Sequence, residues 1–125
     1  MATLTPTLSL TSADATGDAL SLSVSVTGGL ATTIPAINTA QISIGTASAT
    51  NILTTAQATH TYVYLQNTDD TNYVSVKTDG GNVFARLRAG EFMFFPLELS
   101  IGLELQANTG SCIVEYGYWT SGATS

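Results

Sequence analysis

One stretch of this sequence alternates strictly between apolar and hydroxyl side chains, and it constrains the fold more than any other feature. From residue 20 to residue 26, leucine or valine occupies every even position and serine every odd one. A period of two puts successive side chains on opposite faces of an extended chain. This stretch therefore predicts a half-buried strand with one apolar face and one solvent-exposed serine face. Strand-like runs follow at 41–45, 60–67, 73–77, 83–88, 92–97, 99–106 and 112–119.

Residues typical of tight turns separate these runs. Two turns are especially clear, at 68–71 (TDDT) and at 79–82 (DGGN), where glycine accepts positive φ. Short strands joined by such turns predict an antiparallel sandwich or barrel. Only residues 47–58, rich in alanine, would also fit a short helix.

The length of 125 residues corresponds to one domain with a sizeable core. Pro6 cannot donate to a strand ladder, so residues 1–18 are predicted to form an N-terminal arm or an edge strand. Residues 19–119 are assigned to the sandwich, and the small polar residues 120–125 to a flexible tail.

The charges of the chain exclude some partners. Charged residues make up 10% of the sequence, the net charge is −6, and three residues are basic. Such a chain cannot neutralise a run of phosphates, so we expect no nucleic-acid partner. Residues 1–5 lack the features of a signal peptide, and no apolar run approaches membrane-spanning length. We therefore expect synthesis in a cytoplasm and no membrane partner.

Residues that could support catalysis or metal binding are few. His60 is the only histidine, and no nucleophile motif surrounds any serine. Two of the four glutamates on the C-terminal strands could form a carboxylate pair of the kind that hydrolyses glycosides. Solvent-exposed strand faces ordinarily carry acidic residues, however, so we expect a structural position for Glu91, Glu98, Glu104 and Glu115. The two acidic turns lack the spacing of a calcium loop. Cys112 is a lone cysteine, expected to pack as a small hydrophobe. We expect neither an enzyme nor a metal or cofactor.

The strand at 92–97 (FMFFPL) is apolar on both faces, which predicts cover on both sides, by the core and by something else. Pairing of 73–77 with 83–88 would gather Lys77, Arg86 and Arg88 into a small basic spot, suited to ion pairs within or between subunits. The aromatic side chains favour a core or an interface over a sugar-stacking platform. The predicted interface consists of Leu4, Pro6, Leu8, Arg86, Arg88, Phe92, Phe94, Phe95, Tyr116, Tyr118 and Trp119.

Three segments carry a resemblance to a known class of protein. They are 62–74 (YVYLQNTDDTNYV), 86–97 (RLRAGEFMFFPL) and the closing 114–116 (VEY). A strand, an Asn-Thr-Asp turn, a returning strand and Gly-Glu-Phe before an aromatic run resemble the small β-sandwich proteins of tailed-bacteriophage virions, and capsid decoration (cement) proteins above all. The likeness covers residues 60–118.

The resemblance implies a jelly-roll-like sandwich without catalytic machinery, which binds the major capsid protein on the outer capsid surface, often as a homotrimer. Residues 1–10 would then be an arm that clamps neighbouring subunits, and the strand at 92–97 would face the core and a neighbour. Tail and fibre domains of phages share this pattern of short strands and turns, so a receptor- or glycan-binding β-domain of a phage tail or fibre is the alternative.

Overall fold

The computed structural model describes residues 2–13, 20–26, 30–32, 40–53, 61–98 and 101–120. Within these ranges the chain forms twelve strands, all paired antiparallel, and no helix. The predicted all-β fold is confirmed. In the stretch that would also fit a helix, residues 50–53 form a strand and residues 54–58 lie outside the described ranges.

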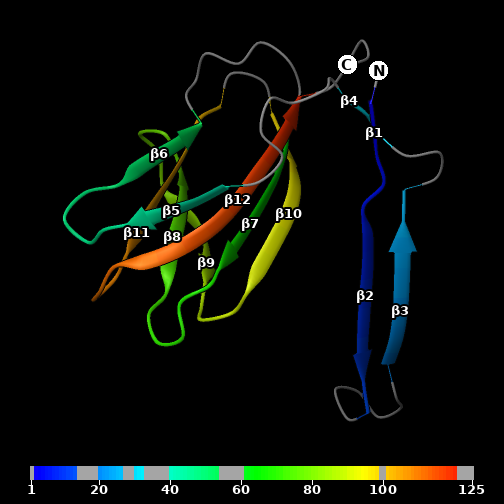
Figure 1. Cartoon of the computed structure of the whole chain (residues 1–125), viewed down its shortest axis with the longest axis horizontal. Coiled ribbons are helices and arrows are strands. Elements are labelled where there is room, and N and C mark those ends of the chain that lie inside the picture. Colours follow the sequence, from blue (N-terminus) through cyan, green and yellow to red (C-terminus); the bar gives the residue numbers. More distant parts are fainter. Residues whose placement is uncertain are drawn as a thin grey trace.

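Eight strands form two four-stranded sheets that pack face to face (Figure 1). The first, called the β7 sheet, has the order β10 (Phe92–Leu97), β7 (Thr61–Asn67), β12 (Cys112–Thr120) and β5 (Ala40–Ile44). The second, called the β8 sheet, has the order β6 (Thr50–Leu53), β11 (Leu103–Ala107), β8 (Val74–Thr78) and β9 (Val83–Leu87).

The alternation of side chains explains why the two sheets pack. In β7 every odd-numbered side chain from Thr61 to Asn67 is buried, and the side chains between them are only half-buried. The partner strands contribute their own inward side chains, among them Val74 and Val76 of β8. The core contains Ile44, Leu53, Val63, Leu65, Val74, Val76, Leu87, Leu97, Leu103, Leu105, Ala107, Cys112 and Val114. The predicted sandwich is therefore present.

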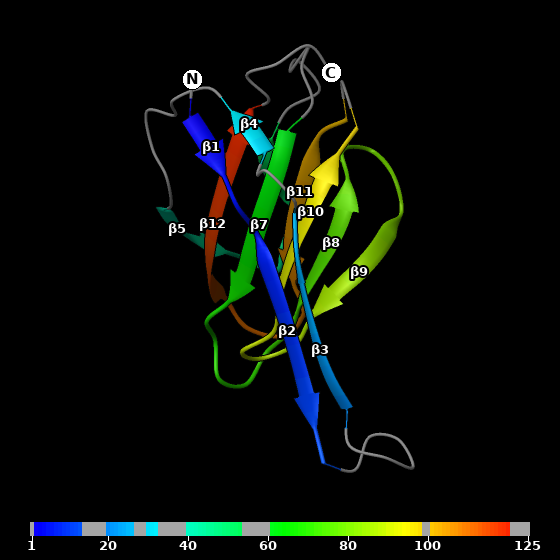
Figure 2. The same ribbon diagram turned by 90° about the vertical axis from the view of Figure 1, so that its right-hand side faces the viewer.

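The remaining four strands form two short two-stranded sheets, which follow one another along the chain and together make one antiparallel ribbon. β1 (Ala2–Leu4) pairs with β4 (Leu30–Thr32), and β2 (Thr7–Ser12) pairs with β3 (Leu20–Ser25). Figures 1 and 2 show this ribbon standing beside the sandwich, in front of the β7 sheet. The boundary predicted at residue 19 is therefore wrong: the alternating strand at 20–25 pairs with the N-terminal arm and adds no strand to the two packed sheets.

Other predicted boundaries shift by a few residues. β11 begins at Leu103, and residues 99 and 100 of the predicted strand lie outside the described ranges. β12 continues to Thr120, whereas the rest of the predicted tail, 121–125, lies outside them, as does His60.

A buried amide fixes the end of the sandwich nearest the turn at 68–73. Asn67 is fully buried at the end of β7, and its Nδ2 donates to the carbonyl oxygens of Asn72 (2.9 Å) and Leu87 (3.0 Å). Its Oδ1 accepts from the backbone N–H of Asp69 (3.0 Å), and its own carbonyl accepts from Gly90 (2.9 Å). One side chain thus ties together the β7–β8 turn and the end of β9.

Candidate functional site

A groove of about 1120 Å³ lies between the ribbon and the outer face of the β7 sheet, and β9 also contributes to its lining. Figure 2 looks onto this face and shows β2 and β3 lying across the strands behind them. The side chains and backbone that line the groove come from Leu4, Pro6, Thr7, Leu8, Leu10, Val24, Ser25, Val26, Tyr64, Ala85, Arg86, Leu87, Gly90, Glu91, Phe92, Met93, Phe94 and Trp119.

The pairing register of the ribbon explains why its groove side is apolar. Leu8 pairs with Val24 and Leu10 with Leu22, so these four side chains share one face. The other face carries only hydroxyl side chains, such as the directly paired Ser9 and Ser23. About half of the apolar face is uncovered, since Leu8 is 42% exposed and Val24 is 53% exposed.

Strand β10 supplies the opposite wall through the same alternation. Phe95 and Leu97 contact or join the core, whereas Phe92 and Phe94 point the other way and line the groove. Met93 packs against the core and also reaches the groove lining. Phe92 is 60% exposed. A strand predicted to be apolar on both faces therefore has the core on one face and an open groove on the other.

A small polar group lies in the groove wall beside these aromatics. The Tyr64 hydroxyl donates to the Glu115 carboxylate (Oη–Oε1 3.0 Å) and lies 2.9 Å from Oε1 of Gln66. Desolvation, helped by the hydrogen bond to Glu115 and by its negative charge, raises the pKa of Tyr64. Its hydroxyl therefore stays protonated and serves as a donor.

The structure brings together most of the predicted interface residues. Seven of the eleven line the groove: Leu4, Pro6, Leu8, Arg86, Phe92, Phe94 and Trp119. Phe95 and Tyr116 pack against the core instead. Tyr118 is exposed, but the register places it opposite Val63, on the other face of the β7 sheet from Trp119. Arg88 is exposed, and its backbone N–H donates to Glu91 Oε1 (2.7 Å).

Sequence reasoning missed the return strand of the ribbon. Val24 and Val26 line the groove although the predicted sandwich included them, and Leu10 and Tyr64 were not assigned to the interface. The strict alternation in β3 was the available signal, because a strand with so regular an apolar face needs a cover. It does not say which surface provides that cover.

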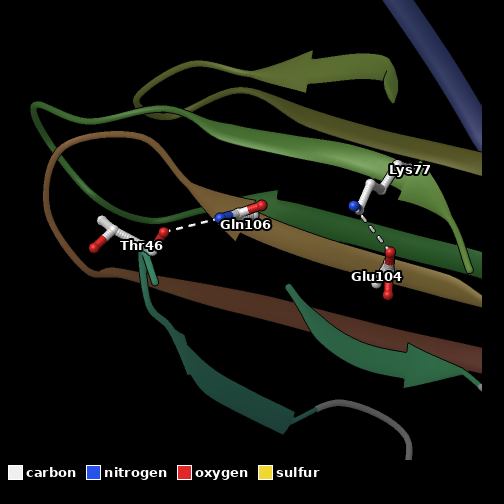
Figure 3. A network of polar contacts seen from close by, with 4 residues as sticks. All are labelled: Thr46, Lys77, Glu104 and Gln106. Atoms are coloured by element: carbon white, nitrogen blue, oxygen red, sulfur yellow. Dashed lines mark hydrogen bonds and ion pairs between the residues drawn. The ribbon is translucent and has the colours of Figure 1, made fainter. Parts of the chain in front are cut away.

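The basic residues contact different partners. Lys77 Nζ lies 3.1 Å from Glu104 Oε1 across β8 and β11, on the outer face of the β8 sheet (Figure 3). On the same face, Gln106 Nε2 donates to the carbonyl of Thr46 (2.8 Å) and ties the β5–β6 connection to β11. Arg86 lies over the ring of Tyr73, 4.1 Å from its centroid. Lys77 therefore has its ion pair within the chain.

The acidic residues weighed for catalysis and metal binding have structural contacts. Glu104 pairs with Lys77, Glu115 accepts from Tyr64, and Glu91 caps the backbone N–H of Arg88. Asp69 Oδ2 accepts from the backbone N–H groups of residues 71 (3.0 Å) and 72 (2.6 Å), and these bonds lower its pKa. Among the described residues, no three His, Cys, Asp or Glu side chains gather in a way that could hold a metal ion.

Cys112 is buried in the core, and burial raises the pKa of its thiol, with a smaller contribution from the charge of Asp69. The thiolate that would react or bind a soft metal is thereby disfavoured.

Comparisons with known proteins add no relative. No protein-family model, curated protein or solved structure matches the chain. In the part of the chain that the structure describes, no helix has the length and apolar character needed to cross a membrane.

Proposed function

We propose that this chain is a structural protein of a tailed-phage virion, namely a capsid decoration protein that binds and stabilises the mature shell. The observation that carries the proposal is the groove. It combines an extended N-terminal ribbon with an outward-facing aromatic strand, and seven of their large apolar side chains are 36–60% exposed. An exposed apolar surface of this kind marks a site of protein association.

The order of the strands supports a jelly roll. If β5 is counted as the first strand of the sandwich and β12 as the eighth, the sheets have the orders 6-3-8-1 and 2-7-4-5. This is the order of an eight-stranded jelly roll, an architecture found in viral capsid proteins and in lectins. A fold alone does not define a function, so the support is by analogy.

In this proposal the protein is made in the host cytoplasm and binds the major capsid protein on the outer surface of the shell, as a homotrimer at a symmetry axis. The ribbon provides the arm that the resemblance to decoration proteins implies. Because the protein binds the mature lattice in preference to the dissociated subunits, binding stabilises the shell by mass action.

The test is to add the purified protein to undecorated shells and to measure their melting temperature and their resistance to pressure. We expect both to rise with protein concentration until the sites are filled. The variant Leu8→Thr/Val24→Thr, which makes two paired groove positions polar, should lose the effect. The matched control Ser9→Thr/Ser23→Thr alters the opposite face of the same strands and should keep it. Shells unchanged by saturating protein would overturn the proposal.

One observation favours the alternative, a receptor- or glycan-binding domain of a tail or fibre. Tyr64 and Trp119 line the groove, and Gln66 and Glu115 lie beside Tyr64, so aromatic and hydrogen-bonding groups adjoin one another as in sugar sites. Binding to a glycan array that Trp119→Ala abolishes, together with unchanged shells, would establish this alternative.

A further inference from the structure

We infer that the groove is the contact through which copies of this chain associate: the apolar face of the ribbon of one copy packs on the outer face of the β7 sheet of another. The inference rests on the proposed adhesive role of the groove and names the partner as a second copy. The assembled ring, and not the single chain, would then be the unit that docks on a larger particle.

The first argument is that the ribbon is incomplete by itself. A two-stranded antiparallel ribbon is at best marginally stable in water and needs a third strand or a packing partner. Here the groove separates its apolar face from the β7 sheet of the same chain, and no ribbon side chain belongs to the hydrophobic core of the described residues. A second layer of apolar side chains in the groove would supply the missing cover.

The second argument is the amount of apolar surface. Seven side chains at or beside the groove are exposed by 36–60%: Leu8, Leu10, Leu22, Val24, Val26, Phe92 and Phe94. With a full side-chain area on the order of 150–250 Å² for an aromatic residue and somewhat less for leucine or valine, they leave roughly 500–600 Å² of apolar surface uncovered. A standard protein interface buries about 800 Å² from each partner, so this patch supplies most of one side of such an interface.

The third argument concerns complementarity. The site has two apolar walls, one on the ribbon and one on β10, and a second copy brings both, so each wall of one copy finds the opposite wall of its neighbour. Copies with a net charge of −6 repel one another through most of their surface. Among the described residues that line the groove, Arg86 and Glu91 are charged and have opposite signs, and the adjoining Glu115 carboxylate accepts a hydrogen bond from Tyr64, so this face brings little like charge together.

Light scattering of the purified protein measures this association directly. We expect a mass that is a multiple of 13.0 kDa, and a trimer if the ring has three subunits. Leu8→Thr/Val24→Thr should reduce the mass to that of a monomer, as should Phe94→Ser, which makes a groove-lining position of the sheet polar. The matched controls are Ser9→Thr/Ser23→Thr and Val83→Ser; Val83 is 56% exposed but does not line the groove. Parent protein that stays monomeric at high concentration would overturn the inference.

A mixed crosslinking experiment tests the geometry. One preparation carries Val24→Cys on the ribbon and a second, tagged preparation carries Phe92→Cys on the sheet. The native Cys112 is buried, so the introduced thiols are the accessible ones. We expect the two preparations, mixed and oxidised, to form a disulfide-linked heterodimer in high yield. Copies that associate without this product would refute the ribbon-to-sheet contact, and the pair Ser23→Cys with Phe92→Cys should give little product.

The outcomes separate this inference from the proposed function. Monomers that still stabilise shells through the groove would refute self-association and leave the decoration role intact. Oligomers with the expected crosslink that leave shells unchanged would support self-association and refute the decoration role.

Discussion

The sandwich and the ribbon are built from the same sequence pattern, yet only the sandwich covers its apolar side chains. In β7, Val63 and Leu65 are at most 1% exposed because the β8 sheet lies against them. In the ribbon, Leu8 and Val24 occupy equivalent alternating positions and remain about half exposed. Alternation thus determines that a strand forms and which of its faces is apolar, whereas a second layer determines whether that face is buried.

The difference has an energetic side. Burying a leucine or valine side chain contributes about 1.5–3 kcal/mol relative to leaving it exposed. The sandwich gains this burial free energy within one chain. The ribbon gains it in full only when a partner fills the groove and covers its apolar side chains. The following substitutions test this contrast, from the largest expected effect to the smallest.

Leu65→Ala in the core should lower the free energy of unfolding by about 3–5 kcal/mol, because it removes a fully buried side chain and leaves a cavity. The same change in the ribbon, Leu10→Ala, should cost less than about 0.5 kcal/mol in dilute solution, because Leu10 is 43% exposed. Denaturant titration followed by circular dichroism measures both. Equal losses at the two positions would mean that the ribbon is already packed on its own sandwich.

Asn67→Ala should lower the free energy of unfolding by about 2–4 kcal/mol, because the carbonyls of Asn72 and Leu87 lose their donor inside the fold. Asn82→Ala, at an exposed turn position, is the control and should change it by less than about 0.5 kcal/mol. Thermal melts of the three proteins would show this. A mild effect of the Asn67 substitution would indicate that water replaces the amide at this end of the sandwich.

Gly90→Ala should cost about 1–2 kcal/mol, because Gly90 has a φ of 80° at the corner between β9 and β10 and an L-residue is strained there. A Cβ at this position would meet no atom within 4 Å, so the cost is purely conformational. Gly45 has equal space and no positive φ, which makes Gly45→Ala the matched control, expected to be neutral or slightly stabilising. Two equal melting temperatures would contradict this account.

The smallest expected effect concerns acid. Two backbone hydrogen bonds lower the pKa of Asp69 in the folded protein, so its contribution to stability is complete above the ordinary pKa of 3.8 and is lost as the pH falls through the lower folded value. Asp69→Asn should therefore lower the melting temperature at neutral pH, and its effect should shrink as the pH falls through the folded pKa of Asp69. Asp79→Asn, which removes a charge from another turn, should show no such loss. A pH-independent difference would point to geometry and not charge.

The fold was predictable in outline because the strands carry their own signals. The alternation in β3, β7 and β12, with the turns at 68–71 and 79–82, indicated strands and their ends from local sequence alone. Pairing was not predictable in the same way. β3 has the cleanest strand signal in the chain, but nothing in residues 20–26 says that its partner is β2 and not a strand of the sandwich.

The groove was predictable only in part, for a related reason. The composition of 92–97 identified a strand that is apolar on both faces, and Pro6 identified an arm, so residues from both walls were expected at an interface. The role of Asn67 could not be read from the sequence, because a buried hub and an exposed turn residue look alike in one chain. Burial depends on contacts between segments far apart, such as that of Asn67 with Leu87.

The strand order has a consequence for biosynthesis. β12 pairs with both β7 and β5, so one sheet of the sandwich lacks an inner strand until residue 120 has been translated, whereas the ribbon needs only the first 32 residues. At translation rates of about 5–20 residues per second, the interval is about 4–18 s. In the nascent chain the ribbon can therefore pair early, whereas the sandwich can form only after β12 has been translated. The long-range strand pairings of the sandwich also favour slow folding. Ribosome-bound chains halted before residue 112 should lack the protected core.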